Sequence, residues 1–189
     1  MMKAMPRLKI ALLAMLALAS LAAHAQKRRD PLTDDEVDQL REQAQNPEDR
    51  LKFWVKFTRA RIAAMDQLRG DPKLAADRPQ RIHDLLADLG DMTGEIDDNM
   101  SMYAKDRWDI RKPLKDIVEL ADELQVKLRS LKEATDPESV KEGKTYRFVL
   151  QDTTEEVKNL GDDARELLEQ QNEQAKEKDP AKKLRKVQK

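Results

Sequence analysis

The chain has 189 residues, with no cysteine, 39% charged residues and only 4% aromatic residues. Without cysteine it cannot use a catalytic thiol, a cysteine-bound zinc ion, an iron–sulfur cluster or covalently attached c-type haem. Its 36 basic and 37 acidic residues nearly balance, giving a net charge of −1. We expect no nucleic-acid partner.

The first 25 residues differ from the rest of the chain. Three basic residues precede an apolar run over 10–23, and Ala23-His24-Ala25 places small residues two positions apart. This is the pattern of a secretory signal peptide. The apolar run is shorter than the roughly 20 residues that a membrane-spanning helix needs. We therefore expect cleavage before Gln26 and a periplasmic or secreted protein, with an uncleaved membrane anchor as the alternative.

The composition after the leader favours an all-α fold. Removing the leader takes away three basic residues and no acidic one, so the net charge changes from −1 to −4. Ala, Glu, Lys, Leu and Arg make up about half of the remainder, as is typical of long helices and coiled coils. With no disulfide available, apolar packing alone must hold the fold.

Two helices are predicted in the first half of this region. Leu32-Thr33-Asp34-Asp35-Glu36 has the spacing of a capping box, which predicts a short helix over about 33–45. Asn46-Pro47 is a typical start for a second helix, over about 47–69, which Gly70 ends. The predicted apolar face of the second helix consists of Phe53, Trp54, Phe57, Ala60, Ala64, Met65 and Leu68.

Three longer helices follow. The third is predicted over about 79–105, capped by Asp77, with apolar residues at Ile82, Leu89, Ile96 and Tyr103. The fourth and fifth show alternating steps of four and three, the pattern of a packed helix seam. The fifth is expected to start near Pro137 and to end near Lys178. The two seams are Ile110, Leu114, Ile117, Ala121, Leu124, Leu128 and Leu131, then Tyr146, Leu150, Thr153, Val157, Leu160, Ala164 and Leu167.

Four long amphipathic helices joined by short polar loops are typical of bundles in which neighbouring helices are antiparallel. We predict one all-α domain over 26–175, an antiparallel up-down-up-down four-helix bundle with a short extra N-terminal helix. The segment 176–189 holds seven basic and two acidic residues. It is expected to be a disordered tail that could make weak contact with an anionic membrane surface.

One acidic stripe is the candidate binding surface. Its members step by four and three along the third helix, and no basic residue lies between 84 and 99. We expect the stripe on the face away from Ile82 and Ile96. It is interpreted as a solvated face, as a docking surface for a cationic protein, or as a weak divalent-cation site. The five residues are Asp84, Asp88, Asp91, Glu95 and Asp98.

Two other residues have competing interpretations. Arg61 falls inside the apolar arc of the second helix, either as a boundary residue whose head reaches water or as one partner of a buried ion pair or anion site. His83 lies off the apolar stripe, as expected of a surface or boundary histidine. Soluble periplasmic b-type cytochrome bundles are similar in leader, size and methionine content, but their histidine ligand lies on the last helix, where this chain has none.

The segment Leu32-Thr33-x-x-Glu36 is similar to the LTxxQ element of small periplasmic stress chaperones, with Glu36 in place of glutamine. The match covers five residues and occurs once. No nucleophile–base pair, Glu-x-x-His motif or Gly-rich phosphate loop is evident. We therefore expect a non-enzymatic exported bundle, without cofactor or metal, that binds a macromolecule or has a structural or chaperone-like role in the envelope. A small-ligand or haem-binding bundle is the alternative.

The leader generates a direct prediction. The protein recovered from an expressing bacterium should begin at Gln26, because cleavage follows the small residues of Ala23-His24-Ala25. Intact-mass and N-terminal peptide analysis would check this, and a recovered chain that still carries Met1 would contradict export by this route.

Overall fold

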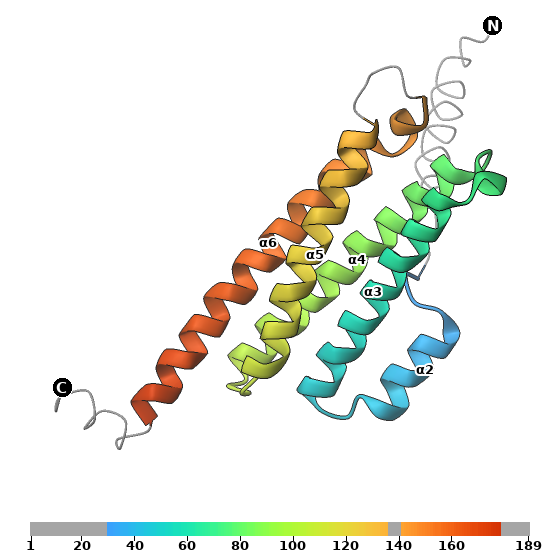
Figure 1. The fold of residues 1–189 in the computed structure, drawn as a ribbon. Coiled ribbons are helices and arrows are strands. Elements are labelled where there is room, and N and C mark those ends of the chain that lie inside the picture. Colours follow the sequence, from blue (N-terminus) through green and yellow to red (C-terminus); the bar gives the residue numbers. More distant parts are fainter. Residues whose placement is uncertain (1–29, 136–140, 179–189) are drawn as a thin grey trace, which may run out of the picture. The chain divides into compact units, whose positions relative to one another are not determined.

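The structure is a computed structural model that describes residues 30–135 and 141–178. Within these ranges the predicted all-α class is confirmed, with no strand (Figure 1). The predicted leader, residue 137 as the start of the last helix, and residues 179–189 of the predicted tail lie outside the described residues. The elements are α2 (Asp34–Gln43), α3 (Pro47–Gly70), the 3-10 helix η1 (Pro72–Leu74), α4 (Arg78–Lys105), α5 (Arg111–Thr135) and α6 (Lys141–Lys178).

Local sequence signals account for the helix starts. Thr33 and Glu36 form the predicted capping box at α2, with Thr33 N donating to Glu36 Oε2 at 2.9 Å and Glu36 N donating to Thr33 Oγ1 at 3.3 Å. Asn46 caps α3 by accepting a 2.9 Å hydrogen bond from the Asp49 amide. Asp77 precedes α4 as predicted, although its side chain makes no capping hydrogen bond.

The predicted seams of α5 and α6 form much of the hydrophobic core. Every residue of the α5 seam is buried, and so is every residue of the α6 seam except Leu167, which is half-buried. The predicted face of α3 needs a correction, because Ala60 is exposed. α3 contacts α2, α4 and α5, so its buried arc is wider than one stripe. Four buried residues of α3 were missing from the predicted face: Leu51, Val55, Thr58 and Ile62.

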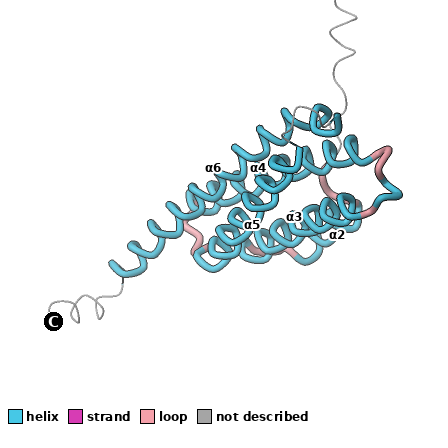
Figure 2. Tube along the Cα trace, turned by 45° about the horizontal axis from the view of Figure 1, so that its top comes forward, coloured by secondary structure: helices cyan, strands magenta, loops and turns pink. Residues whose placement is uncertain are grey.

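Each of the four long helices packs mainly against two of the others. The main pairs within the described residues are α3 with α4, α4 with α6, α6 with α5, and α5 with α3. α4 and α5 are consecutive in the chain but are not one of these pairs. α2 packs against α3 alone among the main pairs. Figure 2 shows the long helices side by side, with α2 beside α3.

Two of the neighbouring pairs run in the same direction. The ion pairs between α3 and α5 join residues whose numbers rise together along both helices. Thr153 of α6 donates a 3.0 Å hydrogen bond to the Leu86 carbonyl of α4, and Asp97 interacts electrostatically with Asp163 further along both helices. This differs from the prediction that all neighbouring helices are antiparallel. The α3–α5 ion pairs are Glu48–Lys112, Arg59–Glu123 and Asp66–Lys127.

The core generates the next prediction. Leu124 lies at the centre of the α5 seam and is 0% exposed. Leu124→Asp would bury an unpaired carboxylate and should lower the free energy of unfolding by several kcal/mol. Val126→Asp, two residues away on the same helix but 63% exposed, is the matched control and should change stability little. Thermal melts followed by circular dichroism would check both, and equal melting temperatures for the two variants would contradict the described core.

Candidate functional site

The five residues of the predicted acidic stripe do not share one environment: Asp88 is buried, and the other four are partly or fully exposed. Asp88 is buried and lies against α3, so its predicted position away from the core is wrong. Asp84 is partly exposed and accepts a 2.9 Å hydrogen bond from Gln80. The other three members, Asp91, Glu95 and Asp98, are partly or fully exposed on α4.

Asp88 belongs to a buried cluster of charges centred on Arg61. The Arg61 guanidinium makes a two-pronged contact with Glu36 of α2, Nη1 to Oε1 at 2.8 Å and Nη2 to Oε2 at 2.6 Å. Nη2 also donates to the Pro31 carbonyl at 2.6 Å, and Nε lies 3.9 Å from Asp88 Oδ2. The side chains of Arg61 and Glu36 are each 12% exposed. Of the two interpretations of Arg61, the structure therefore favours the ion pair, since its guanidinium binds carboxylates in a largely buried place and does not reach out to water.

This cluster joins three helices through one guanidinium, since Glu36 lies on α2, Arg61 on α3 and Asp88 on α4. Burial acts to raise the pKa of Glu36, but hydrogen bonds from Arg61 and from Thr33 outweigh it, so the pKa lies below its usual value of 4.5. Glu36 therefore remains ionised at neutral pH. Its carboxylate caps α2 and at the same time attaches α2 to α3.

Glu36→Gln tests this attachment. Glutamine can keep the capping box but removes the charge that Arg61 binds, so the free energy of unfolding at pH 7 should fall by about 1.5–3 kcal/mol, the range for hydrogen bonds to charged groups. Because the folded pKa of Glu36 is lowered, its contribution is present above pH 4.5 and is lost as the pH falls through the folded pKa. Urea titrations at pH 7 and pH 3 would check this; Glu42→Gln, an exposed change on α2, is the control. An effect of equal size at both pH values would contradict the ionic role.

Three further acids that sequence analysis did not select lie near the exposed acids of α4: Asp97 on α4 itself, and Glu156 and Asp163 on α6. Asp97 is partly buried. Burial raises its pKa most, and the nearby carboxylates of Asp163 and Asp98 raise it further. Glu156 of α6 lies over Gly90, where an added Cβ atom would be 2.6 Å from Glu156 Oε2. We call this group the acidic surface: Asp91, Glu95, Asp97 and Asp98 of α4 with Glu156 and Asp163 of α6.

The acidic surface arises from the parallel packing of α4 and α6. Asp97 precedes Asp98 and lies off the predicted stripe, so sequence spacing on one helix could not select it. Its environment depends on Asp163, which is 66 positions away in the chain and comes close because α4 packs on α6. Like charges that close together oppose folding, so other interactions must hold the acidic surface in place.

His83 lies on the surface as expected. It is partly exposed, and its Nδ1 lies 3.2 Å from Asp84 Oδ1, with the hydrogen position set by the tautomer. A partly exposed histidine beside a carboxylate gives no support to axial haem ligation inside the helix core. No group of three or more His, Asp or Glu side chains in residues 30–135 and 141–178 is arranged to hold a metal ion. Over the same residues no helix is long and apolar enough to cross a membrane.

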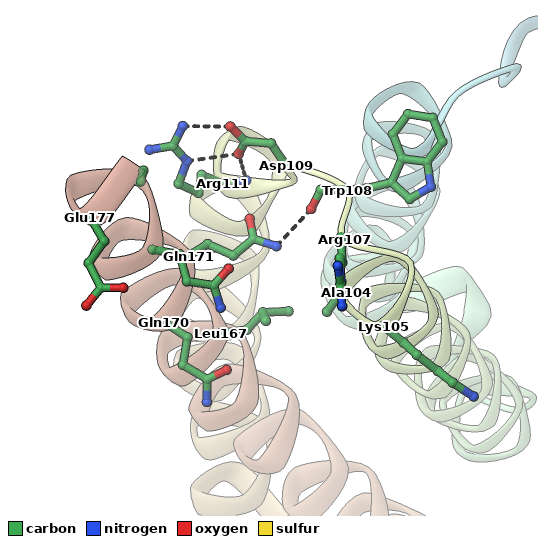
Figure 3. Close-up of a pocket in the computed structure, with 12 residues that line it drawn as sticks. Ala104, Lys105, Arg107, Trp108, Asp109, Arg111, Leu167, Gln170, Gln171 and Glu177 are labelled. Carbon is green, nitrogen blue, oxygen red and sulfur yellow. Dashed lines mark hydrogen bonds and ion pairs between the residues drawn. The ribbon is translucent and has the colours of Figure 1, made fainter. Parts of the chain in front are cut away.

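A further surface feature lies where α4 turns into α5. An open groove of about 810 Å³ separates this turn from the last turns of α6 (Figure 3). Gln171 of α6 holds the turn by donating to the Trp108 carbonyl and by accepting from the Ile110 amide, both at 3.0 Å. Asp109 and Arg111 pair at 2.6 Å beside the groove. The sequence patterns did not identify this feature, because it depends on a contact between residues about 60 positions apart.

The chain matches no protein-family model, no curated protein and no solved structure.

Proposed function

We propose that this protein is an exported, non-enzymatic helical bundle that acts in the cell envelope by binding a cationic macromolecule at the acidic surface. The leader pattern supports export. The partner is inferred to be a protein segment rich in lysine or arginine, because such a segment complements a surface on which like charges gather. A chaperone-like or structural role is consistent with this kind of binding.

The gathering of carboxylates from α4 and α6 on one surface is the observation that carries the proposal. Burial and the neighbouring carboxylates of Asp163 and Asp98 raise the pKa of Asp97, which is in line with this crowding. A cationic partner would offset the repulsion between these carboxylates, so part of the binding free energy would be electrostatic. Residues 84–104 of α4 contain no basic side chain that could offset the repulsion between these carboxylates.

We also propose that the four long helices form an up-down-up-down bundle in which the chain reverses at each connection. Support comes from cross-helix contacts. Arg61 meets Asp88, whereas Arg78 bonds to the Leu68 carbonyl, so numbers fall on α3 as they rise on α4. On α5 and α6, Asp122 pairs with Arg165 and the Ile110 amide bonds to Gln171. In this arrangement α4 and α5 lie on a diagonal.

The binding proposal can be tested by neutralising acids of α4 that are partly or fully exposed. The variant Asp91→Asn, Glu95→Gln, Asp98→Asn leaves Asp88 and its pairing with Arg61 intact. Binding of a fluorescent oligolysine peptide, measured by anisotropy at low salt and at 0.15 M salt, should weaken at least about tenfold in this variant. The expected loss of affinity with salt follows from screening over about 8 Å at 0.15 M.

A control variant separates local docking from general charge. Glu42→Gln, Glu119→Gln, Glu169→Gln changes the net charge equally at exposed acids on three other helices. It should retain nearly all of the binding. Equal weakening by the two triple variants would reject the acidic surface as a docking site, and envelope proteins captured by the wild type but not by the first variant would identify the natural partner.

A further inference from the structure

The turn between α4 and α5 is built so that an indole faces outward. α4 ends in a Schellman motif, in which the Trp108 amide donates to the Tyr103 carbonyl at 2.9 Å and the Arg107 amide to the Ala104 carbonyl at 3.0 Å. Arg107 has φ of 64°, and it is the only non-glycine residue with positive φ in the described part of the chain. Glycine is the usual residue at this position of the motif. A non-glycine residue with positive φ is uncommon.

Trp108 is exposed although its backbone is firmly held. Its side chain is 53% exposed, and Met102, in the last turns of α4, is 48% exposed. Figure 3 shows the indole pointing away from Gln171 and from α6, while Gln171 bonds to the carbonyl of the same residue. The indole is therefore presented to solvent by a fixed turn.

Basic residues are frequent in the sequence next to these two apolar side chains. Residues 105–115 contain five basic and two acidic side chains, whereas residues 84–104 of α4 contain six acids and no basic residue. Arg111 is paired with Asp109 and Lys112 with Glu48. The remaining charges of the segment are those of Lys105, Arg107 and Lys115 against Asp106. In Figure 3, Lys105 also extends away from α6. The turn thus forms a cationic, partly apolar end beside an otherwise acidic helix.

We propose that this turn, Met102, Lys105, Arg107 and Trp108, docks on an anionic lipid membrane. Indole rings favour the boundary between lipid headgroups and acyl chains, and each basic residue near an anionic surface strengthens binding about fivefold. A soluble polyanion would attract the charges equally but would leave the indole and the methionine in water. The same anionic lipids repel the acidic surface, which fixes the turn as the part that faces the membrane. The proposal does not depend on what binds the acidic surface.

Trp108 can report its own insertion. The chain has two tryptophans, and Trp54 is 4% exposed with its indole nitrogen lacking a hydrogen-bond partner in the described residues. Trp54→Phe removes that buried polar group and leaves Trp108 as the single fluorophore. With the protein as recovered from the expressing cells, vesicles of phosphatidylglycerol and brominated phosphatidylcholine should shift Trp108 emission to the blue and quench it. Vesicles of brominated phosphatidylcholine alone should do neither, and quenching of equal strength in both vesicle types would overturn the proposal.

Three variants test the residues. Trp108→Ala should weaken partition to anionic vesicles about tenfold, and Arg107→Gly about fivefold while folding at least as stably as the wild type, because glycine suits the positive φ. Phe148→Ala is the control: Phe148 is 70% exposed, with Arg147 5.2 Å from its ring centroid, on α6. It should bind as the wild type does.

Two results would overturn the proposal. One is an unchanged partition of Trp108→Ala, measured by vesicle sedimentation. The other is binding of a soluble sulfated polysaccharide that weakens as strongly in Trp108→Ala as vesicle binding does, which would assign the turn to polyanions in general.

Discussion

The buried seam of α6 is the interaction on which the rest of the structure depends. α6 packs against both α4 and α5, and its seam is buried from Tyr146 to Ala164. The pairing with α4 brings acids of the two helices together, and the pairing with α5 lets Gln171 reach the α4–α5 turn. Both surface features described above are therefore consequences of where one apolar stripe is buried. No disulfide contributes, since the chain has no cysteine.

Charge is arranged differently inside and outside this core. The Arg61 guanidinium meets two carboxylates and a carbonyl, so its buried charge is matched by specific partners. Such a cluster adds little net stability compared with an apolar replacement. Its contacts with Glu36 and with the Pro31 carbonyl attach α2 and the residues before it to α3. On the acidic surface the carboxylate of Asp163 on α6 acts on Asp97 of α4, so like charges from two helices interact there. The first arrangement matches each charge with a partner inside the protein, and the second is the surface to which we assign the proposed binding.

Sequence reasoning succeeded where one helix determines the outcome. The seams of α5 and α6, the capping box at Thr33 and the helix class need only local periodicity or spacing. It failed where two helices determine the outcome. Asp88 follows the same spacing as the exposed acids, and only the position of Arg61 on α3 shows that it is buried. The periodic pattern of a single helix also does not show which helices are neighbours around the core. α4 and α5 are consecutive in the chain, yet they are not one of the main packing pairs.

In the up-down-up-down arrangement proposed above, the pairing order corresponds to two helical hairpins, α3–α4 and α5–α6, packed side by side. Contacts within each hairpin are local in sequence and form early, whereas contacts of α3 with α5 and of α4 with α6 close long stretches of chain. The hairpins are connected by the α4–α5 turn, which Gln171 holds to α6. The pairings of α4 with α6 and of α3 with α5 are therefore expected to form last during folding, although α4 with α6 is the most extensive pairing once the molecule is folded.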